Sequence, residues 1–386
     1  MKSNYNQLGQ YIEMVSRTNS DLKYGIEDVR GCSNTKQMMQ TRANLIGRTY
    51  EKFIVLRPQE FVFNRRTTRN GEKIGMAYNN TDREYIFTND YVAFRVKQEY
   101  LDELLPDYLY MFFCRDEFDR YARYKSTGSA TEFFNWEDMC AVPFEIPPMD
   151  FQQLVVNAYK VLNERIETKQ KINDNLATQA LTLFSDFVSH RSKKLEQRKL
   201  GDVIASANTG GDAIQKVPIV DYDTGIKCAR VGDITNAREY ASWAFCNASK
   251  SVYDNYKLQA GDILVTRTAT LGITQYIAKD ISAVYNNGLI RLKVDDTNAL
   301  SLYIYWAMKT SDFLNYINQM NSATSVRPNM KIDYLLNYQL SIPSIEEQTQ
   351  FTNAVEPLMK AISLNNDEIL KLSEFQAIIL TTLSSR

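Results

Sequence analysis

The chain has 386 residues, of which 44% are hydrophobic, 24% charged and 12% aromatic, and this length suits two or three folded domains. Its formal net charge of −1 excludes a uniformly basic coat protein for nucleic acid, so any anion-binding surface must be local. The single histidine, His190, excludes a metal centre of several histidines, and its charged linker favours a solvated side chain over a catalytic one.

The five cysteines are scattered, and no two of them form a Cys-x-x-Cys pair. Disulfide frameworks and zinc ribbons are therefore not expected. No apolar run approaches the ~20 residues that cross a bilayer, and the polar start of the chain lacks the apolar stretch of a signal peptide. We expect a cytoplasmic protein that does not contact a membrane.

Two blocks of mixed composition, residues 1–149 and 190–341, are typical of α/β domains. Within them, alternating apolar runs predict strands and aromatic runs predict buried helices. The predicted strands are Lys52–Leu56, Tyr91–Val96, Asp262–Val265 and Leu289–Val294, and the predicted helices are Tyr108–Phe113 and Leu302–Met308.

Each block is followed by a long helical segment, at residues 150–189 and 342–386. Apolar positions step by four and three residues throughout both segments, which is the spacing of a coiled coil. Pro357 in the second segment predicts a kink or a first turn. The two series are Val155, Tyr159, Leu162, Ile166, Lys169, Asn173, Leu176, Ala180, Leu183, Phe187 and Phe351, Val355, Leu358, Ile362, Asn365, Ile369, Leu372, Gln376, Ile379, Leu383.

An antiparallel pairing of the two helices along their full series places Asn173 opposite Asn365. The end pairs of that alignment are Val155 with Leu383 and Phe187 with Phe351. A polar pair inside an apolar seam costs stability but can fix the register. We therefore predict that the two asparagines lock the register. Two ordinary amphipathic helices, each packed on its own domain, are the alternative.

The chain also repeats itself, because short motifs recur in the same order in both halves. Ile146–Gln152 recurs as Ile342–Gln348, and Leu8-Gly9 recurs as Leu200-Gly201. This order predicts an α+β architecture with a pseudo-twofold internal repeat, in which two α/β domains alternate with two long helices paired as an antiparallel coiled coil.

Motifs of catalysis are missing from the sequence. No stretch supplies the G-x-x-x-x-G-K-[ST] loop of a nucleotide-driven motor. The only Pro-Pro pair, Pro147-Pro148, lacks the polar and aromatic neighbours of a DNA amino-methyltransferase loop, and no carboxylates cluster with a lysine as in a nuclease. We expect no catalytic residue and no metal site.

Basic residues among hydroxyl and amide side chains are the positive signal. Arginine and lysine neutralise phosphates, while arginine, asparagine and threonine can also contact base edges. Solvated loops and a solvated helix face are the alternative. The DNA-binding candidates are Arg65, Arg66, Arg69, Asn70 and Lys73 in one loop, Arg120, Arg123 and Lys125 on a helix, Arg267, Thr268 and Thr270 in the positional counterpart of that loop, and Arg327 and Asn329 at a proline turn.

These motifs together resemble the specificity subunit of type I restriction-modification systems. The resemblance rests on the Ile-Pro-x-x-(Glu/Asp)-x-Gln start of each long helix, the Leu-Gly-(Asp/Gln)-x-Ile start of each domain, and Gly261–Arg267. It implies that residues 1–149 and 190–341 are target-recognition domains, each of which reads one half of a split, asymmetric site in double-stranded DNA. The long helices would be spacers between them.

The resemblance further implies a DNA-binding subunit without catalysis of its own. Two methyltransferase subunits would dock on the helices, and restriction and translocase subunits would join them. S-adenosylmethionine, ATP and Mg would then be bound by these partners and not by this chain. A free-standing nuclease or methyltransferase, and a coiled-coil scaffold that does not bind nucleic acid, are the alternatives.

Overall fold

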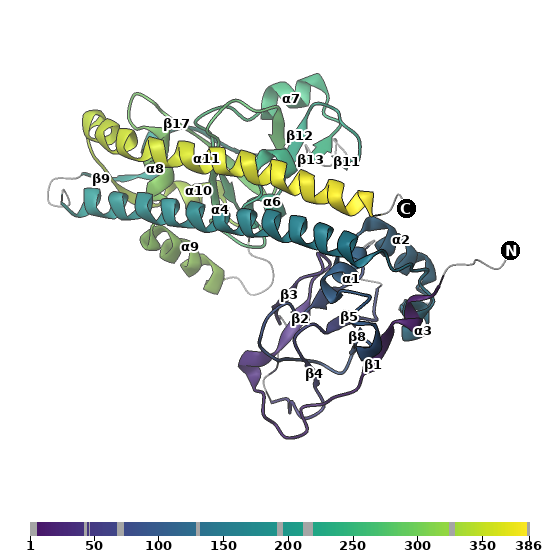
Figure 1. Ribbon diagram of the computed structural model, residues 1–386. Helices are drawn as coiled ribbons and strands as arrows, with labels where there is room; N and C mark the ends of the chain where they lie inside the picture. The colour runs from purple at the N-terminus through teal and green to yellow at the C-terminus, as the bar shows by residue number, and fades with distance from the viewer. Residues whose placement is uncertain are drawn as a thin grey trace. The chain divides into compact units, whose positions relative to one another are not determined.

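The computed structural model describes residues 6–41, 45, 47–67, 73–128, 132–190, 196–210, 219–323 and 329–383. The chain forms two compact units, Met1–Ile166 with Lys371–Arg386, and Glu167–Leu370. Each unit joins an α/β domain to parts of two long helices (Figure 1). The sequence-based division into 1–149, 150–189, 190–341 and 342–386 set the helices apart, whereas the compact units divide each helix between them.

The first unit contains a mixed domain of short strands and helices. Its 4-stranded sheet has the order β1-β8-β5-β6, and every neighbouring pair is antiparallel. The elements are η1 (Leu8–Gln10), β1 (Ile12–Val15), η2 (Ile26–Asp28), β2 (Arg30–Cys32), β3 (Met38–Gln40), β4 (Ile54–Leu56), β5 (Phe61–Asn64), β6 (Met76–Tyr78), β7 (Tyr85–Phe87), β8 (Tyr91–Val96), η3 (Gln98–Tyr100), α1 (Pro106–Phe113), α2 (Asp116–Lys125) and α3 (Trp136–Cys140).

The second unit builds its main sheet in the same way, with the order β10-β17-β14-β15 and antiparallel neighbours. A second sheet, β11-β13-β12-β16, contains one parallel pair. The elements are β9 (Glu196–Lys199), η4 (Leu200–Val203), β10 (Ile204–Thr209), β11 (Ile219–Val220), β12 (Lys227–Ala229), α6 (Val231–Thr235), η5 (Tyr240–Ser242), β13 (Ala244–Cys246), α7 (Lys250–Tyr256), β14 (Ile263–Thr266), β15 (Thr274–Tyr276), β16 (Ala283–Tyr285), β17 (Leu289–Val294), α8 (Ser301–Ala307), α9 (Ser311–Ala323), α10 (Ile332–Leu336) and β18 (Gln339–Ile342).

The strands and helices predicted from alternation and aromatic runs are confirmed, with bounds that shift by no more than two residues. The alternation of apolar and polar residues predicted strands correctly because one face of each main sheet packs on aromatic and aliphatic side chains. The Phe61 and Phe94 rings of β5 and β8 stack 5.0 Å apart, and both are fully buried. Ile263 and Leu292 occupy the corresponding pair in the second unit.

The long helices are α4 (Met149–Ser189, 41 residues) and α11 (Ile345–Thr382, 38 residues). Pro357 lies inside α11 and does not end it. In the second unit the two helices lie side by side and antiparallel, with the Phe187 and Phe351 rings 5.5 Å apart (Figure 1). In the first unit, the end pair Val155 and Leu383 belongs to one apolar cluster.

The predicted series is wrong at Leu183, whose side chain is 42% exposed, whereas its neighbour Phe184 is only 4% exposed. The Phe184 ring packs 5.3 Å from Phe351 and 5.2 Å from Tyr303. A straight helix has 3.6 residues per turn, so a strict heptad series drifts off the seam with length.

Each long helix is fastened at its start by a fully buried glutamine. The Oε1 atom of Gln152 accepts the Leu105 N–H at 2.9 Å, and its Nε2 donates to the Glu103 and Pro147 carbonyls at 2.7 and 2.8 Å. Gln348 makes the equivalent hydrogen bond in the second unit, where its Oε1 accepts the Leu300 N–H at 2.7 Å. The glutamine of the repeated motif thus joins each long helix to the residue before α1 or α8.

Candidate nucleic-acid interface

In the first unit the candidate loop leaves the sheet at the end of β5 and pairs with residues 132–134, called here the first edge segment. The N–H of Phe134 donates to the Arg65 carbonyl at 2.9 Å, and the N–H of Thr67 donates to the Glu132 carbonyl at 3.0 Å. The Arg65 side chain is exposed, whereas Thr67 is buried. The pairing therefore holds the backbone while the arginine faces solvent.

The basic face of α2 lies against the same edge segment. Arg123 pairs with Glu132 at 2.5 Å between Nη1 and Oε2. Lys125 ends α2 beside Tyr124, whose side chain is 83% exposed, and Arg120 is exposed one turn earlier. The structure therefore brings the loop arginine and the helix face together. Tyr124, a ring on which a base could stack, was not singled out from the sequence, although it stands between two chosen residues.

Two further candidates in this unit pair with carboxylates on the surface. Arg66 lies 3.3 Å from Asp90, and Lys73 lies 3.6 Å from Asp116 at the start of α2. Exposed ion pairs of this kind contribute little to stability and exchange readily for phosphate contacts. Arg69 and Asn70 lie outside the described residues.

In the second unit the corresponding loop leaves β14 and pairs with residues 329–330, the second edge segment. The N–H of Met330 donates to the Arg267 carbonyl at 2.8 Å, and Thr268 bridges to Asn329. Thr270 is exposed, two residues before the turn at Gly272. Arg267, Thr268 and Asn329 thus lie together, and Arg327 lies outside the described residues.

Arg65 and Arg267 occupy equivalent backbone positions, since each carbonyl accepts from the edge segment of its own unit. Their side chains differ. The Arg267 Nε donates to the Met330 carbonyl at 3.1 Å, and its Nη1 donates to the Asn287 carbonyl and Oδ1 at 3.2 Å each. Arg267 therefore braces its own loop, a role that the sequence did not predict because its partners come from separate turns.

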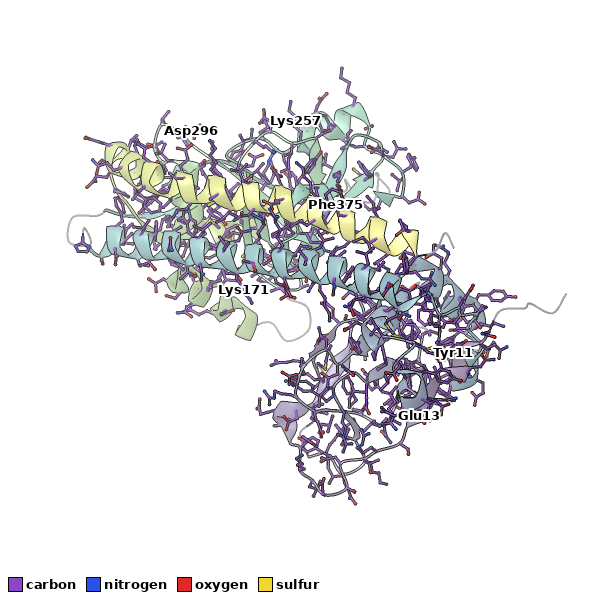
Figure 2. All side chains as sticks on the ribbon, in the orientation of Figure 1. Tyr11, Glu13, Lys171, Lys257, Asp296 and Phe375 are labelled. Atoms are coloured by element: carbon purple, nitrogen blue, oxygen red, sulfur yellow. The ribbon has the colours of Figure 1, made fainter. Side chains whose placement is uncertain are left out.

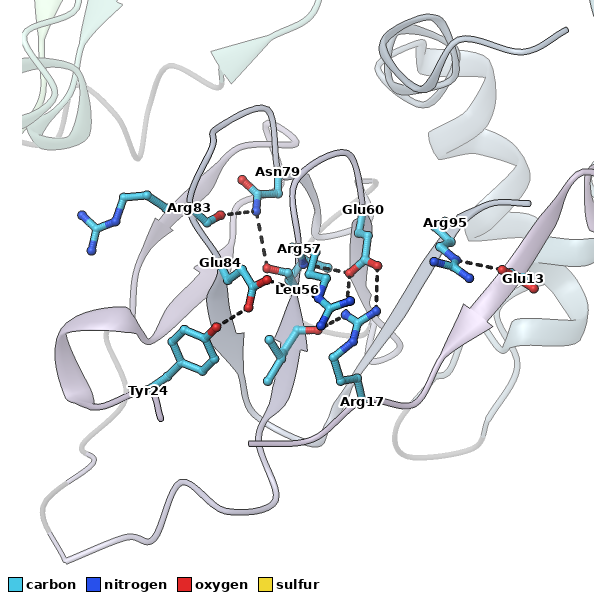
Figure 3. Close-up of polar contacts among 11 residues, drawn as sticks. Glu13, Arg17, Tyr24, Leu56, Arg57, Glu60, Asn79, Arg83, Glu84 and Arg95 are labelled. Atoms are coloured by element: carbon cyan, nitrogen blue, oxygen red, sulfur yellow. Dashed lines mark hydrogen bonds and ion pairs between the residues drawn. The ribbon is translucent and has the colours of Figure 1, made fainter. Parts of the chain in front are cut away.

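A second group of charged residues in the first unit was missed altogether, and Figure 3 shows three of its members, Arg57, Arg83 and Glu84. The guanidinium carbon of Arg30 lies 4.6 Å from the centre of the Tyr85 ring, and that of Arg83 lies 5.8 Å from it. Arg57 pairs with Glu84 at 3.2 Å. These residues come from different strands and turns, so no local run of basic residues marks them.

The seam between α4 and α11 contains a polar layer. The Asn365 Nδ2 donates to the Asn173 Oδ1 at 2.9 Å, and the Asn173 Nδ2 donates to the Asn366 Oδ1 at 2.7 Å. Lys169 adds an ion pair with Glu368 at 2.7 Å and a hydrogen bond to Asn365 at 3.0 Å. The structure thus brings Asn173 and Asn365 together, and their role in fixing the register stays a prediction.

Candidate metal clusters and candidate membrane spans are both absent from the described parts of the chain. No group of three His, Cys, Asp or Glu side chains there is placed to hold a metal ion. No described helix is long and apolar enough to cross a membrane.

Comparison with known proteins places this arrangement in a family. Residues 192–374 match the family model described as the type I restriction modification DNA specificity domain. Residues 192–374 therefore belong to this specificity-domain family. No curated protein matches the chain significantly.

Solved structures extend the likeness in fold to both units. The S subunit of a type I restriction-modification system from M. genitalium gives a TM-score of 0.50 at 14% identity, over 98% of this chain and 96% of that chain. An HsdS subunit from Thermoanaerobacter tengcongensis gives 0.35 at 16% identity, over 98% and 95%. The first likeness shows a common fold along nearly the whole chain.

Proposed function

We propose that this specificity chain reads a split, asymmetric site in double-stranded DNA, with one half of the site read by each unit. One observation carries the proposal: a loop paired with an edge segment occurs at equivalent places in both units, around Arg65 and around Arg267. The side chains on the two frameworks differ, so the two half-sites would differ in sequence. Other DNA-binding proteins likewise match the spacing of half-sites to the spacing of their reading modules.

The proposed reading surface combines exposed cations with hydroxyl and amide groups. Arg65, Arg66, Arg120 and Arg123 would neutralise phosphates or contact base edges in the first unit, while Thr268 and Asn329 offer hydrogen bonds in the second. The net charge of −1 agrees with a binding surface confined to these loops.

The chemistry would be performed by partners. We propose that two methyltransferase subunits dock on the long helices in the cytoplasm and that restriction and translocase subunits join them, so that the partners bind S-adenosylmethionine, ATP and Mg. Exposed apolar side chains on both helices support docking there, and Figure 2 labels one of them, Phe375 of α11. They are Leu154 (68% exposed), Val161 (62%), Ile172 (42%) and Leu183 (42%) on α4, and Leu364 (61%), Phe375 (57%) and Ile378 (55%) on α11.

The helices would also set the length of unread DNA between the half-sites. Adding one four-residue step to either helix lengthens it by about 6 Å. We expect such an insertion to change the spacer or to abolish methylation.

Methylation mapping tests the proposed function. The full chain is produced with its methyltransferase partner in a host without other methylation, and the modified bases are located across the genome. We expect a split, asymmetric motif. Replacing residues 190–341 with the matching block of a related subunit should change one half of the motif only. If both halves changed, or neither, the two-module reading would be wrong.

The alternatives predict different results. Cleavage or methylation by the purified chain alone would favour a free-standing enzyme. A scaffold would be favoured if the assembled complex did not bind DNA, or if its affinity for DNA did not depend on salt. Phosphate contacts make the affinity for DNA fall as the salt concentration rises.

A further inference from the structure

A buried lysine in the first unit, Lys36, contacts Ile74, the residue that follows the last candidate of the loop. Lys36 is only 3% exposed, although lysine is rarely buried without a partner. Its backbone adopts the left-handed region, with φ 61°, which non-glycine residues seldom occupy. Its carbonyl accepts the hydroxyl of Tyr110 at 3.2 Å. The fold therefore holds both the backbone and the side chain of this residue in costly positions.

The partners of Lys36 converge on one residue. Its Nζ donates to the Ile74 carbonyl at 3.0 Å and forms an ion pair with Asp119. The Asp119 Oδ1 in turn accepts the Ile74 N–H at 3.0 Å. Both backbone polar groups of Ile74 are thus bonded to the ion pair. Ile74 directly follows Lys73, the last candidate residue of the loop.

The ion pair also reaches the second part of the proposed DNA surface. Asp119 lies in α2, next to Arg120 and one turn before Arg123. The buried side of α2 therefore fixes the end of the loop while its exposed side presents cations. Lys36, Asp119 and Ile74 form one connection between these two parts.

We propose that Lys36 and Asp119 are positioning residues for DNA recognition, because together they fix Ile74, and with it the adjoining Lys73, to the helix α2 that carries Arg120 and Arg123. The proposal rests on the proposed function. A buried ion pair is poor evidence for added stability, because desolvation of the two charges offsets their attraction. Burial lowers the pKa of Lys36, and Asp119 opposes that change. The pair is better explained by the geometry that it imposes on Ile74.

The test removes both charges and preserves an acceptor for the Ile74 N–H. In the assembled complex, Lys36→Met with Asp119→Asn should leave the half-motif read by the second unit unchanged. Methylation at sites with one mismatch in the other half-motif should rise about tenfold, equivalent to about 1.4 kcal/mol of discrimination. The block exchange described above identifies which half belongs to which unit.

A matched control removes another ion pair of the same unit, in which Glu60 is buried and Arg17 is half-buried. Arg17 pairs with Glu60 through two hydrogen bonds of 3.1 Å, and Glu60 is 4% exposed (Figure 3). This pair holds the turn between β4 and β5 and not the loop. Arg17→Met with Glu60→Gln should leave both half-motifs unchanged. Equal relaxation in the control and in the Lys36 variant would overturn the positioning role.

The failures of the two proposals can be told apart. A wild-type complex without a split motif would contradict the proposed function. A split motif that stays unchanged in a folded Lys36→Met, Asp119→Asn variant would contradict the positioning role alone. If that variant does not fold, hydrogen exchange of the wild-type complex tests the positioning role instead. The amide of Ile74 should exchange as slowly as those of β8, and exchange at the rate of an open loop would overturn the proposal.

Discussion

The two units secure the same point of their folds by different chemistry. Ile74 and Gly272 each precede the next strand, β6 or β15, by two residues. A buried ion pair holds Ile74 to α2, whereas Gly272 packs directly against Ile317 of α9. The backbone path is common to both units and the means of fixing it is not. A domain of this fold can therefore change the chemistry at this point without changing its topology.

A lysine also lies near this point in the second unit. The Lys309 Nζ donates to the carbonyl of Thr274, the first residue of β15, at 2.8 Å. Lys36 has Asp119 as its counter-charge, but no carboxylate pairs with Lys309 among the residues described by the structure. Burial lowers the pKa of Lys309 to about 8. The first unit therefore neutralises its buried cation, while the second unit bears the cost of desolvation.

The largest effect is expected at Gly272. Its φ is 77°, and a Cβ there would lie 2.9 Å from the Ile317 Cγ2, so Gly272→Ala adds a clash to backbone strain. We expect a loss of about 2–4 kcal/mol in the free energy of unfolding. Gly225→Ala is the matched control, because its φ is 73° and its Cβ would meet nothing within 4 Å. Equal losses measured by denaturant unfolding would show that packing against α9 is unimportant.

The two equivalent arginines should separate binding from stability. If Arg65 contacts a base, Arg65→Ala should weaken DNA binding by about 1–3 kcal/mol and relax the sequence preference at one position of the site. If Arg65 contacts a phosphate, the change should instead reduce the slope of affinity against salt by about one. It should leave the Tm unchanged. Arg267→Ala should lower the Tm as well, because the bonds to Asn287 and Met330 are lost. Unchanged affinity in both variants would remove these residues from the interface.

A pH series should sharpen the comparison of the two lysines. Between pH 8 and the ordinary lysine pKa of 10.5, the unfolded chain retains a proton that folded Lys309 has lost, so the free energy of unfolding rises with pH. We expect wild type to gain about 3 kcal/mol over Lys309→Met across this window, because each pKa unit corresponds to about 1.4 kcal/mol. Denaturant unfolding at several pH values measures it, and a flat difference would contradict the burial of an unpaired cation.

The smallest effect on stability is expected in the seam between α4 and α11. Replacing Asn173 and Asn365 with leucine should change the free energy of unfolding by less than about 1 kcal/mol or raise it, because an apolar pair restores seam packing. Slipped registers should then appear as mixed spacer lengths in the methylated motif. The control Asn157→Leu, at an exposed position of α4, should give a methylated motif with a single spacer length. A single spacer in the double variant would contradict the role of the asparagines.

The features that could be predicted from the sequence are those whose signal is local and repeated. The long helices and the pairing of Asn173 with Asn365 follow from a spacing that recurs over many turns. The error at Leu183 arose because that spacing was extended without the drift of a straight helix. Lys36 could not be found in this way, since Asp119 lies 83 residues away in the chain and no local pattern marks the pair.

The candidate interface was predictable to the level of segments and not of side chains. Composition located the loops around Arg65 and Arg267, because basic and hydroxyl residues gather there. It could not distinguish an arginine that faces solvent from one that braces its own loop, since that depends on Asn287 and Met330 arriving from other turns.

The buried glutamines at the starts of α4 and α11 have a consequence for the exchange of domains between chains of this fold. Every partner atom of Gln152, and likewise of Gln348, belongs to the main chain. Main-chain N–H and C=O groups are offered by almost any sequence. An incoming recognition domain could therefore be accepted at this joint whatever side chains it carries. Gene segments exchanged at the Ile-Pro-x-x-(Glu/Asp)-x-Gln motif would yield a folded subunit with a new DNA target in a single event.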